Sequence, residues 1–316
     1  MMASGIWTWS RMWTALPFTF ATIKASMEAS KEPAAGVTEV MATIWGDEGN
    51  ECDIWSALPG VWYHAEQAYT AAEEVDADLL RLKFDGCAGG SFDDYVMGSK
   101  LDDTQPEAQV ITSSTHYTPN MSKYLLWEEP FFSFLSPQYQ GSNLEAHYSH
   151  LATYLGQATS AEFSTMTTIS VPHSIDDFPA NARLRLPLLL ARVLALKCHL
   201  RERLTNAYKQ ADAAELVALA GPDPDSRLSR LRGLVKELHE THRANWFGVY
   251  KPFGWEVLDL RYGGLRSRLE TMHDRCARYT DQDDKSVTRL EELEVELEVS
   301  RVCFFPMDWP ESQARG

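Results

Sequence analysis

The residues best suited to chemistry stand together in one short run, Thr43-Ile44-Trp45-Gly46-Asp47-Glu48-Gly49-Asn50-Glu51. A flat indole beside a carboxylate suits a sugar, because the ring covers the apolar C–H face while the carboxylate accepts hydrogen bonds from hydroxyl groups. The run therefore predicts a carbohydrate contact at Trp45 and Asp47. The alternative from composition is that the tryptophan fills a core or domain contact and that the acidic loop is simply solvated.

The neighbouring acids Asp47 and Glu48 also suggest glycosidic chemistry. Most glycosidases use two carboxyl groups that face each other across the scissile bond, roughly 5 to 9 Å apart. Neighbours in a turn can reach that separation, so the pair is a candidate. The simpler interpretation is that one acid contacts a ligand while the other faces solvent.

Two strands and two helices must position these residues. The expected elements are a strand at 4–9, a helix at 16–30, a strand at 37–45 and a helix at 54–72. This order favours parallel strands joined by crossovers, and ligands bind at the C-terminal ends of such strands. Side chains alternate along a strand, so Thr43, Trp45 and Asp47 are expected on one side. The first expected strand also carries tryptophans near its C-terminal end, namely Trp7 and Trp9.

The rest of the chain has a different pattern. Apolar residues repeat at spacings of three and four, which predicts helices at 77–84, 144–155, 184–208, 228–246, 255–279 and 287–299. Residues 91–141 are expected to be irregular, and Gly86–Gly90 is expected to be a turn. Two parallel strands cannot form a domain, because parallel sheets are buried on both faces. The front of the chain therefore looks like the end of a larger α/β unit with a helical appendage.

Two adjacent glycines, Gly263 and Gly264, interrupt the helix expected at 255–279. Glycine inside a helix costs about 1 kcal/mol relative to alanine, so a packing reason is expected. We predict that these glycines let this helix approach the α/β unit closely. Pro252 and Gly254 mark the start of the same helix.

Charge and composition exclude several classes of function. The net charge is −16, which opposes binding to phosphate backbones, so no nucleic acid is expected as a partner. The most apolar stretch, Leu184–Leu200, is interrupted by charges and a proline, so no membrane span is expected. The five cysteines lack a Cys-x-x-Cys pair, which favours a reduced, cytoplasmic chain. No motif for a phosphate or dinucleotide is present, and no cofactor or metal is expected, although His147/His150 and His239/His242 have helical spacing.

Several separate blocks of this sequence resemble glycoside hydrolase family 20, the exo-acting β-N-acetylhexosaminidases. The resemblance is to the bacterial-type subgroup with a large C-terminal helical domain, and it covers nearly the whole chain. The front blocks are Ser4–Trp9, Thr43–Asp47 and Leu58-Pro59, which resemble the end of the catalytic barrel. The rear blocks, which resemble the helical domain, are Lys123–Trp127, Ala191–Lys197 and Tyr250–Glu256 through Leu265.

The resemblance implies the last two βα units of a TIM barrel, an α/β remnant, followed by a mainly α-helical domain. Residues 1–72 would be the barrel end, and residues 73–316 the helical domain. Trp45 and Asp47 match the family's Trp-Gly-acid motif, so Trp45 would line the sugar pocket and Asp47 would bind a distal hydroxyl of the terminal sugar. Trp7 and Trp9 would belong to the same aromatic pocket, and Glu51 is a further candidate.

The family's catalytic Asp-Glu pair, at the end of the fourth barrel strand, is expected before this chain begins. In this family the acetamido oxygen of the substrate attacks the anomeric carbon, so Asp47 and Glu48 do not take over that role. The chain is therefore expected to be the C-terminal portion of a hexosaminidase, inactive alone, with terminal β-linked N-acetylhexosamine sugars as ligands. Its expected partner is a missing N-terminal barrel portion or a homo-oligomer. The alternative is a non-catalytic remnant that binds carbohydrate or another protein.

Overall fold

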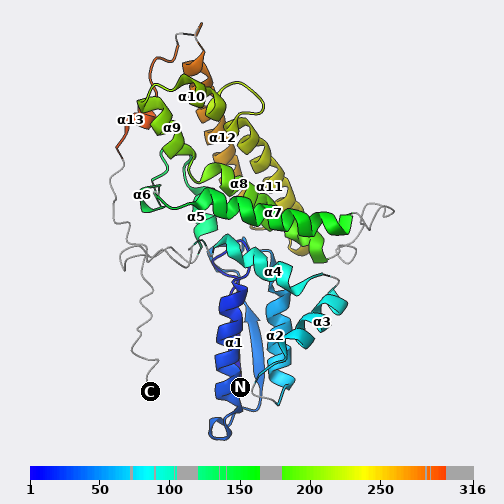
Figure 1. Ribbon diagram of the computed structural model, residues 1–316. Helices are drawn as coiled ribbons and strands as arrows, with labels where there is room; N and C mark the ends of the chain where they lie inside the picture. The colour runs from blue at the N-terminus through cyan, green and yellow to red at the C-terminus, as the bar shows by residue number, and fades with distance from the viewer. Residues whose placement is uncertain are drawn as a thin grey trace.

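The computed structural model describes residues 1–71, 74–88, 90–102, 104, 120–134, 136–139, 141–163, 180–281, 283–284 and 286–296. A small α/β part lies at one end of the molecule, and long helices lie at the other (Figure 1). We call helices α5 and α7–α12, whose bounds follow, the helical bundle.

The α/β part begins with a parallel pair of strands joined through a helix. Strand β1 (Met2–Ile6) pairs with β2 (Val40–Ile44) in parallel, from Met2 beside Val40 to Ile6 beside Ile44. Helix α1 (Leu16–Lys31) and the short helix η1 (Pro33–Ala35) connect them. The predicted β-α-β-α order and its parallel strands are therefore confirmed. Both strands are shorter than expected, so Trp7, Trp9 and Trp45 lie just beyond the strand ends.

Helices cover one face of this two-stranded sheet. The short helix η3 (Ile54–Ala57) leads into α2 (Leu58–Tyr69), and α2 lies beside α1 against the strands (Figure 1). Between them lies a small core of Ile6, Ile23, Met27 and Ala57. A Cβ at Gly60 of α2 would lie 3.0 Å from Ile6 Cγ2, so the glycine permits this close approach.

Helices make up most of the remaining described residues. They are α3 (Ala77–Ala88), α4 (Phe92–Gly98), η4 (Ser99–Leu101), α5 (Met121–Trp127), α6 (Ser136–Tyr139), α7 (Leu144–Phe163), η6 (Ala180–Leu184), α8 (Arg185–Lys197), α9 (Leu200–Lys209), α10 (Ala213–Ala220), α11 (Arg227–Val249), α12 (Trp255–Thr280) and α13 (Glu291–Glu294). Apolar spacing therefore located the long helices correctly, and α12 starts directly after Gly254, whose φ is +97°. The helical character predicted for this part is confirmed.

Four expectations about the helices were wrong in detail. The stretch 91–141 contains α4 and α5, because Ser91 caps α4 by accepting from the Asp94 amide and because α4 buries Phe92 and Tyr95. Gly86 lies inside α3 and not in a turn. The helix expected at 184–208 is divided between α8 and α9, where His199 leaves the helical backbone conformation. Of the helix expected at 287–299, the described residues contain only α13; residues 297–299 lie outside them.

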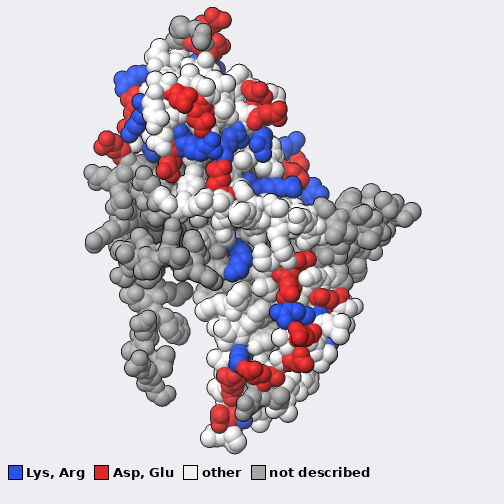
Figure 2. All heavy atoms as spheres, in the orientation of Figure 1, with Lys and Arg blue, Asp and Glu red and all other residues white. Residues whose placement is uncertain are grey.

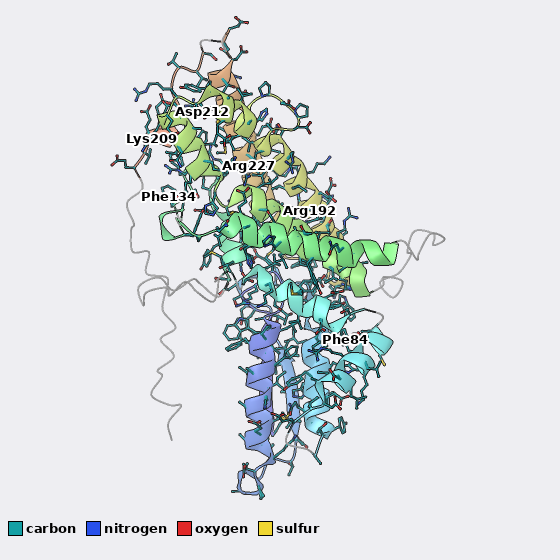
Figure 3. The ribbon with its side chains drawn as sticks, viewed as in Figure 1. Phe84, Phe134, Arg192, Lys209, Asp212 and Arg227 are labelled. Atoms are coloured by element: carbon teal, nitrogen blue, oxygen red, sulfur yellow. The ribbon has the colours of Figure 1, made fainter. Side chains whose placement is uncertain are left out.

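One large apolar core joins the helical bundle to the α/β part. Helix α8 lies at its centre, packed against α5, α7 and α11, and nearly all of its residues are buried. The same core continues through Trp13 and Tyr95 to Phe84 of α3 (Figure 3). The Phe84 ring makes edge-on contacts with the rings of Trp62 and Phe92. Helix α3 thus packs on α2, across the predicted boundary between the barrel end and the helical domain at residues 72 and 73. That domain boundary stays a prediction.

The two glycines of α12 do not serve the purpose expected of them. Gly263 and Gly264 are exposed, and a Cβ at either position would have no atom within 4 Å, counting the described residues only. The contact of α12 with the α/β part is made instead by Arg261, two residues earlier. Packing density at glycines could not be read from the sequence, because it depends on which face of the helix meets another element.

Candidate functional site

The predicted sugar-binding residues gather at the C-terminal edge of the β1–β2 sheet. Trp45 directly follows β2, and Asp47 opens a short helical turn, η2 (Asp47–Gly49). Both side chains are exposed, and Trp45 retains 56% of its surface. Because an exposed indole is costly to hydrate, its position at this edge is consistent with a ligand or partner surface.

Trp7 and Trp9 stand at the same edge of the sheet. Their rings are 4.4 Å apart between centroids and tilted by 31°, and Trp7 also meets Phe18 edge-on. Trp9 packs across Gly5 of β1, where a Cβ would lie 3.3 Å from the indole. The hydroxyl of Thr8, between the two tryptophans, donates to the backbone carbonyl of Trp45 at 2.6 Å. The chain segments of the three predicted tryptophans are therefore tied together.

The acidic loop, residues 45–51, has an unusual backbone. Glu48, Gly49 and Asn50 have φ values of +56°, +102° and +53°, so three successive residues are left-handed. This conformation costs roughly 1 to 2 kcal/mol for a residue with a Cβ. Interactions elsewhere must therefore hold the loop in this form.

Glu51, the fifth predicted residue, supplies that interaction from inside the protein. Its side chain has no exposed surface, and its carboxylate pairs with Arg261 of α12 and, at 3.0 Å, with the Lys123 ammonium of α5. Lys123 also donates to the backbone carbonyl of Glu48 at 3.0 Å, and Arg261 lies over the Trp127 ring. The structure thus brings Glu51 to the same loop as Trp45, but it turns the carboxylate toward the helical bundle.

A second buried acid joins the same segment to the bundle. Asp53 accepts from the Trp55 amide at 3.0 Å and from the Asn245 side chain at 3.1 Å, and it pairs with Arg183 at 3.4 Å. Burial raises the pKa of this carboxyl, and Arg183 opposes the shift. No local sequence pattern could have identified Lys123, Arg261, Arg183 or Asn245, because each partner lies far along the chain.

A pocket of about 570 Å³ opens between the acidic loop and the helical bundle. The loop contributes Glu48 and Gly49 to its wall. Helices α5 and α12 and the residue before α5 contribute the remainder, namely Asn120, Lys123, Tyr124, Trp127, Arg261 and Leu265. Aromatic surface and hydrogen-bonding groups are thus combined in a concave site, which is the usual composition of a small-molecule site.

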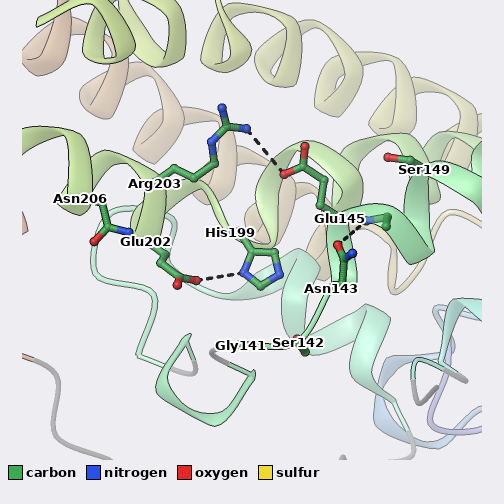
Figure 4. A pocket seen from close by; sticks show the side chains of 10 residues that line it. Gly141, Ser142, Asn143, Glu145, Ser149, His199, Glu202, Arg203 and Asn206 are labelled. Atoms are coloured by element: carbon green, nitrogen blue, oxygen red, sulfur yellow. Dashed lines mark hydrogen bonds and ion pairs between the residues drawn. The ribbon is translucent and has the colours of Figure 1, made fainter. Parts of the chain in front are cut away.

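Another pocket of about 560 Å³ lies on the bundle, between α7 and α9 (Figure 4). Its charged residues are paired with one another. His199 pairs with Glu202 at 3.1 Å, and Glu145 receives two hydrogen bonds from Arg227 in addition to its contact with Arg203. No Trp or Tyr is among the described residues that line this pocket, whereas Tyr124 and Trp127 line the pocket beside the acidic loop, so this pocket is a weaker candidate for the functional site. On the face drawn in Figure 2, basic and acidic side chains are likewise interspersed over the bundle.

Three of the four histidines paired in the sequence, His147, His239 and His242, serve packing or hydrogen bonding. His239 stacks on Tyr262 and pairs with Asp259 at 2.9 Å, and His242 hydrogen-bonds the Tyr262 hydroxyl at 3.0 Å. His147 hydrogen-bonds the backbone carbonyl of Lys100. Within the described ranges, no group of three or more His, Cys, Asp or Glu residues is placed to hold a metal ion.

His242 should make stability depend on pH. Burial lowers its pKa to about 4, nearby His239 adds to the shift, and a hydrogen bond to the Glu51 backbone opposes it. Between pH 6.5 and 4 the unfolded chain binds this proton more readily, so the free energy of unfolding should fall as pH drops. From pH 7 to 4.5, we expect the protein to lose about 2 to 3 kcal/mol more than the His242→Gln variant. Urea unfolding at both pH values measures this, and equal losses in the two proteins would refute it.

Among the residues that the structure describes, no helix is both long enough and apolar enough to cross a bilayer.

Comparison with known proteins addresses the helical bundle directly. No curated protein matches the chain. The family model of the glycoside hydrolase 20C C-terminal domain matches residues 93–302, which is more than half of the sequence and runs from the second residue of α4 to beyond α13. The chain therefore belongs to glycoside hydrolase family 20, of which it carries the 20C C-terminal domain.

Proposed function

We propose that this chain is the C-terminal portion of an exo-acting β-N-acetylhexosaminidase and supplies part of its sugar pocket. Residues 1–72 are then the seventh and eighth βα units of a (β/α)8 barrel, and residues 73–316 are the helical domain. Trp7, Trp9, Trp45 and Asp47 would contact a terminal β-linked N-acetylhexosamine. The observation that carries the proposal is the parallel β1–β2 pair, covered by helices on one face, with these tryptophans at its C-terminal edge.

The uncovered face of the sheet supports the barrel interpretation. Met41 of β2 lies on the face opposite Val40 and Ala42, which pack on the helix-side core, and it is 43% exposed although it is apolar. In a parallel α/β barrel one face of the sheet packs on helices and the other lines the packed interior. A two-stranded sheet alone is marginal in water, so further strands beside β1 and β2 would bury this face.

The chemistry assigned to these residues is binding and not proton transfer. Trp45 offers an indole face for the C–H surface of a sugar, and Asp47 offers carboxylate oxygens to its hydroxyls. Glu48 and Glu51 both contact Lys123, and the proposal gives neither of them a general-acid role. Family 20 chemistry uses the acetamido group of the substrate with an Asp-Glu pair from the fourth strand, and the proposal assigns that pair to another segment.

The test separates binding from turnover. The purified chain is assayed with a chromogenic N-acetylglucosaminide, and N-acetylglucosamine binding is followed by saturation-transfer NMR. We expect no turnover above a Trp45→Ala control, sugar binding that Trp45→Ala abolishes, and turnover when the six other βα units of a family 20 barrel are supplied. The proposal would be overturned by turnover in the chain alone, or by sugar binding that is unchanged in the Trp45→Ala variant. Binding without turnover in the completed barrel would favour a carbohydrate-binding remnant.

A further inference from the structure

We infer that Lys123 and Arg261 of the helical bundle are positioning residues that hold the acidic loop in the form that presents Trp45 and Asp47 to the sugar. The inference rests on the proposed function for the identity of the ligand. It assigns the helical domain a direct part in substrate recognition, in addition to its packing role.

The loop needs an external restraint, because its own hydrogen bonds are weak. Within its turn, the Asn50 amide donates to the Asp47 carbonyl at 3.5 Å, which is a long distance for a hydrogen bond. Three left-handed residues in succession are seldom stable without such a restraint. Trp45 and Asp47 precede these residues directly, so a change in the loop backbone would move both side chains.

Lys123 closes the loop from the bundle side. Its ammonium lies 3.0 Å from the backbone carbonyl of Glu48 and 3.0 Å from the Glu51 carboxylate, so one group contacts two points of the loop. The side chain is 10% exposed, so water screens these contacts less than it screens a solvated ion pair. Helix α5 is itself anchored, because the Ser122 amide donates to the buried Asp102 carboxylate at 2.7 Å.

Arg261 approaches the same carboxylate from a different helix. It pairs with Glu51, and its guanidinium lies 5.9 Å from the centre of the Trp127 ring. Two cations from α5 and α12 therefore meet one acid of the loop. Because a buried carboxylate requires partners, the position of Glu51 is set by the packing of the bundle.

A purely stabilising ion pair would make a different prediction. Removal of such a pair would lower the free energy of unfolding without changing the loop in the folded state. Local amide exchange distinguishes the two, since it reports the opening of a short segment separately from global unfolding.

The test compares Lys123→Met with Lys123→Arg in the 316-residue chain. Lys83→Met is the matched control, because Lys83 also pairs with a glutamate, Glu66 at 2.9 Å, but lies away from the loop. Hydrogen exchange is measured for amides 46–51, with α8 as the reference for an intact fold. A fluorine label on Trp45, assigned with Trp45→Phe, reports the indole environment.

We expect Lys123→Met to speed exchange in the loop by about tenfold and to shift the Trp45 fluorine signal, with α8 unchanged. Lys123→Arg should restore most of the protection, and Lys83→Met should change nothing in the loop. The inference is overturned if amides 46–51 exchange at the same rate in Lys123→Met as in the unmodified chain while α8 keeps its protection. If α8 also loses protection, Arg261→Gln, which removes the charge from a side chain that is 40% exposed, must still speed loop exchange with α8 unchanged for the inference to stand.

Sugar binding then distinguishes this inference from the proposed function. Equal N-acetylglucosamine affinity in the unmodified chain and in Lys123→Met would overturn the positioning role while leaving the proposed function intact. Failure of the unmodified chain to bind the sugar would refute the proposed function, and the exchange data would still decide whether Lys123 holds the loop.

Discussion

Replacing Glu51 by alanine is expected to lower the free energy of unfolding by about 3 to 5 kcal/mol. The carboxylate is fully buried between Lys123 and Arg261. Its removal leaves the Lys123 ammonium, which is 10% exposed, beside Arg261 with only the half-exposed Glu48 as a counter-charge. Breaking a buried pair in this way costs more than the pair itself contributes, because the remaining charge stays desolvated. Urea unfolding at neutral pH, followed by circular dichroism, measures the loss.

Glu48→Gln is the matched control for this change. Glu48 pairs with the same lysine at 3.3 Å, but its side chain is 50% exposed. Water screens such a pair, so the control should lose less than about 1 kcal/mol. Similar losses for Glu51→Ala and Glu48→Gln would show that burial of the carboxylate has no energetic consequence, and the account of the loop given above would fail.

Gly98→Ala is expected to destabilise the junction between the α/β part and the bundle by about 2 to 3 kcal/mol. A Cβ at Gly98 would lie 2.4 Å from Nε1 and 2.7 Å from Cε2 of Trp13. The Trp13 ring cannot move aside easily, because it is 1% exposed and its Nε1 donates to the Tyr95 carbonyl at 2.9 Å. The overpacked ring must shift or leave its rotamer, and either response costs energy.

Gly264→Ala is the opposite case and serves as the control. This glycine lies inside α12, and a Cβ there would meet no described atom within 4 Å. Alanine should therefore stabilise the protein by about 1 kcal/mol, since only the helix propensity changes. Thermal unfolding of both variants checks the pair. A Gly98→Ala protein as stable as Gly264→Ala would contradict the close packing of Trp13.

Much of the fold could be predicted because its signals are local. The spacing of apolar residues predicted the first residues of α7, α11 and α12 to within a few positions. Gly254, as a signal for the start of a helix, located the first residue of α12. The short helices α4 and α5 were missed, because their stability comes from burial of Phe92, Tyr95 and Leu125 in the common core and not from a long periodic pattern.

The candidate site could likewise be predicted only where its signals are local. Strand order and alternation were sufficient to bring Trp7, Trp9 and Trp45 to one edge of the sheet, as the Thr8–Trp45 hydrogen bond shows. Their role in sugar binding stays a prediction. Glu51 was included with them, yet its carboxylate is enclosed by cations of the bundle. Nothing near Glu51 in the sequence indicates which basic residues would reach it.

By itself, the sequence determined the β-α-β-α order, the long helices and the family to which the chain belongs, because periodicity and motif spacing are properties of neighbouring residues. The tertiary structure alone decided that Lys123 and Arg261 close on the acidic loop. Arg261 is 210 residues from Glu51, and such distant charges meet only when burial of a shared core leaves a desolvated carboxylate that opposite charges must neutralise.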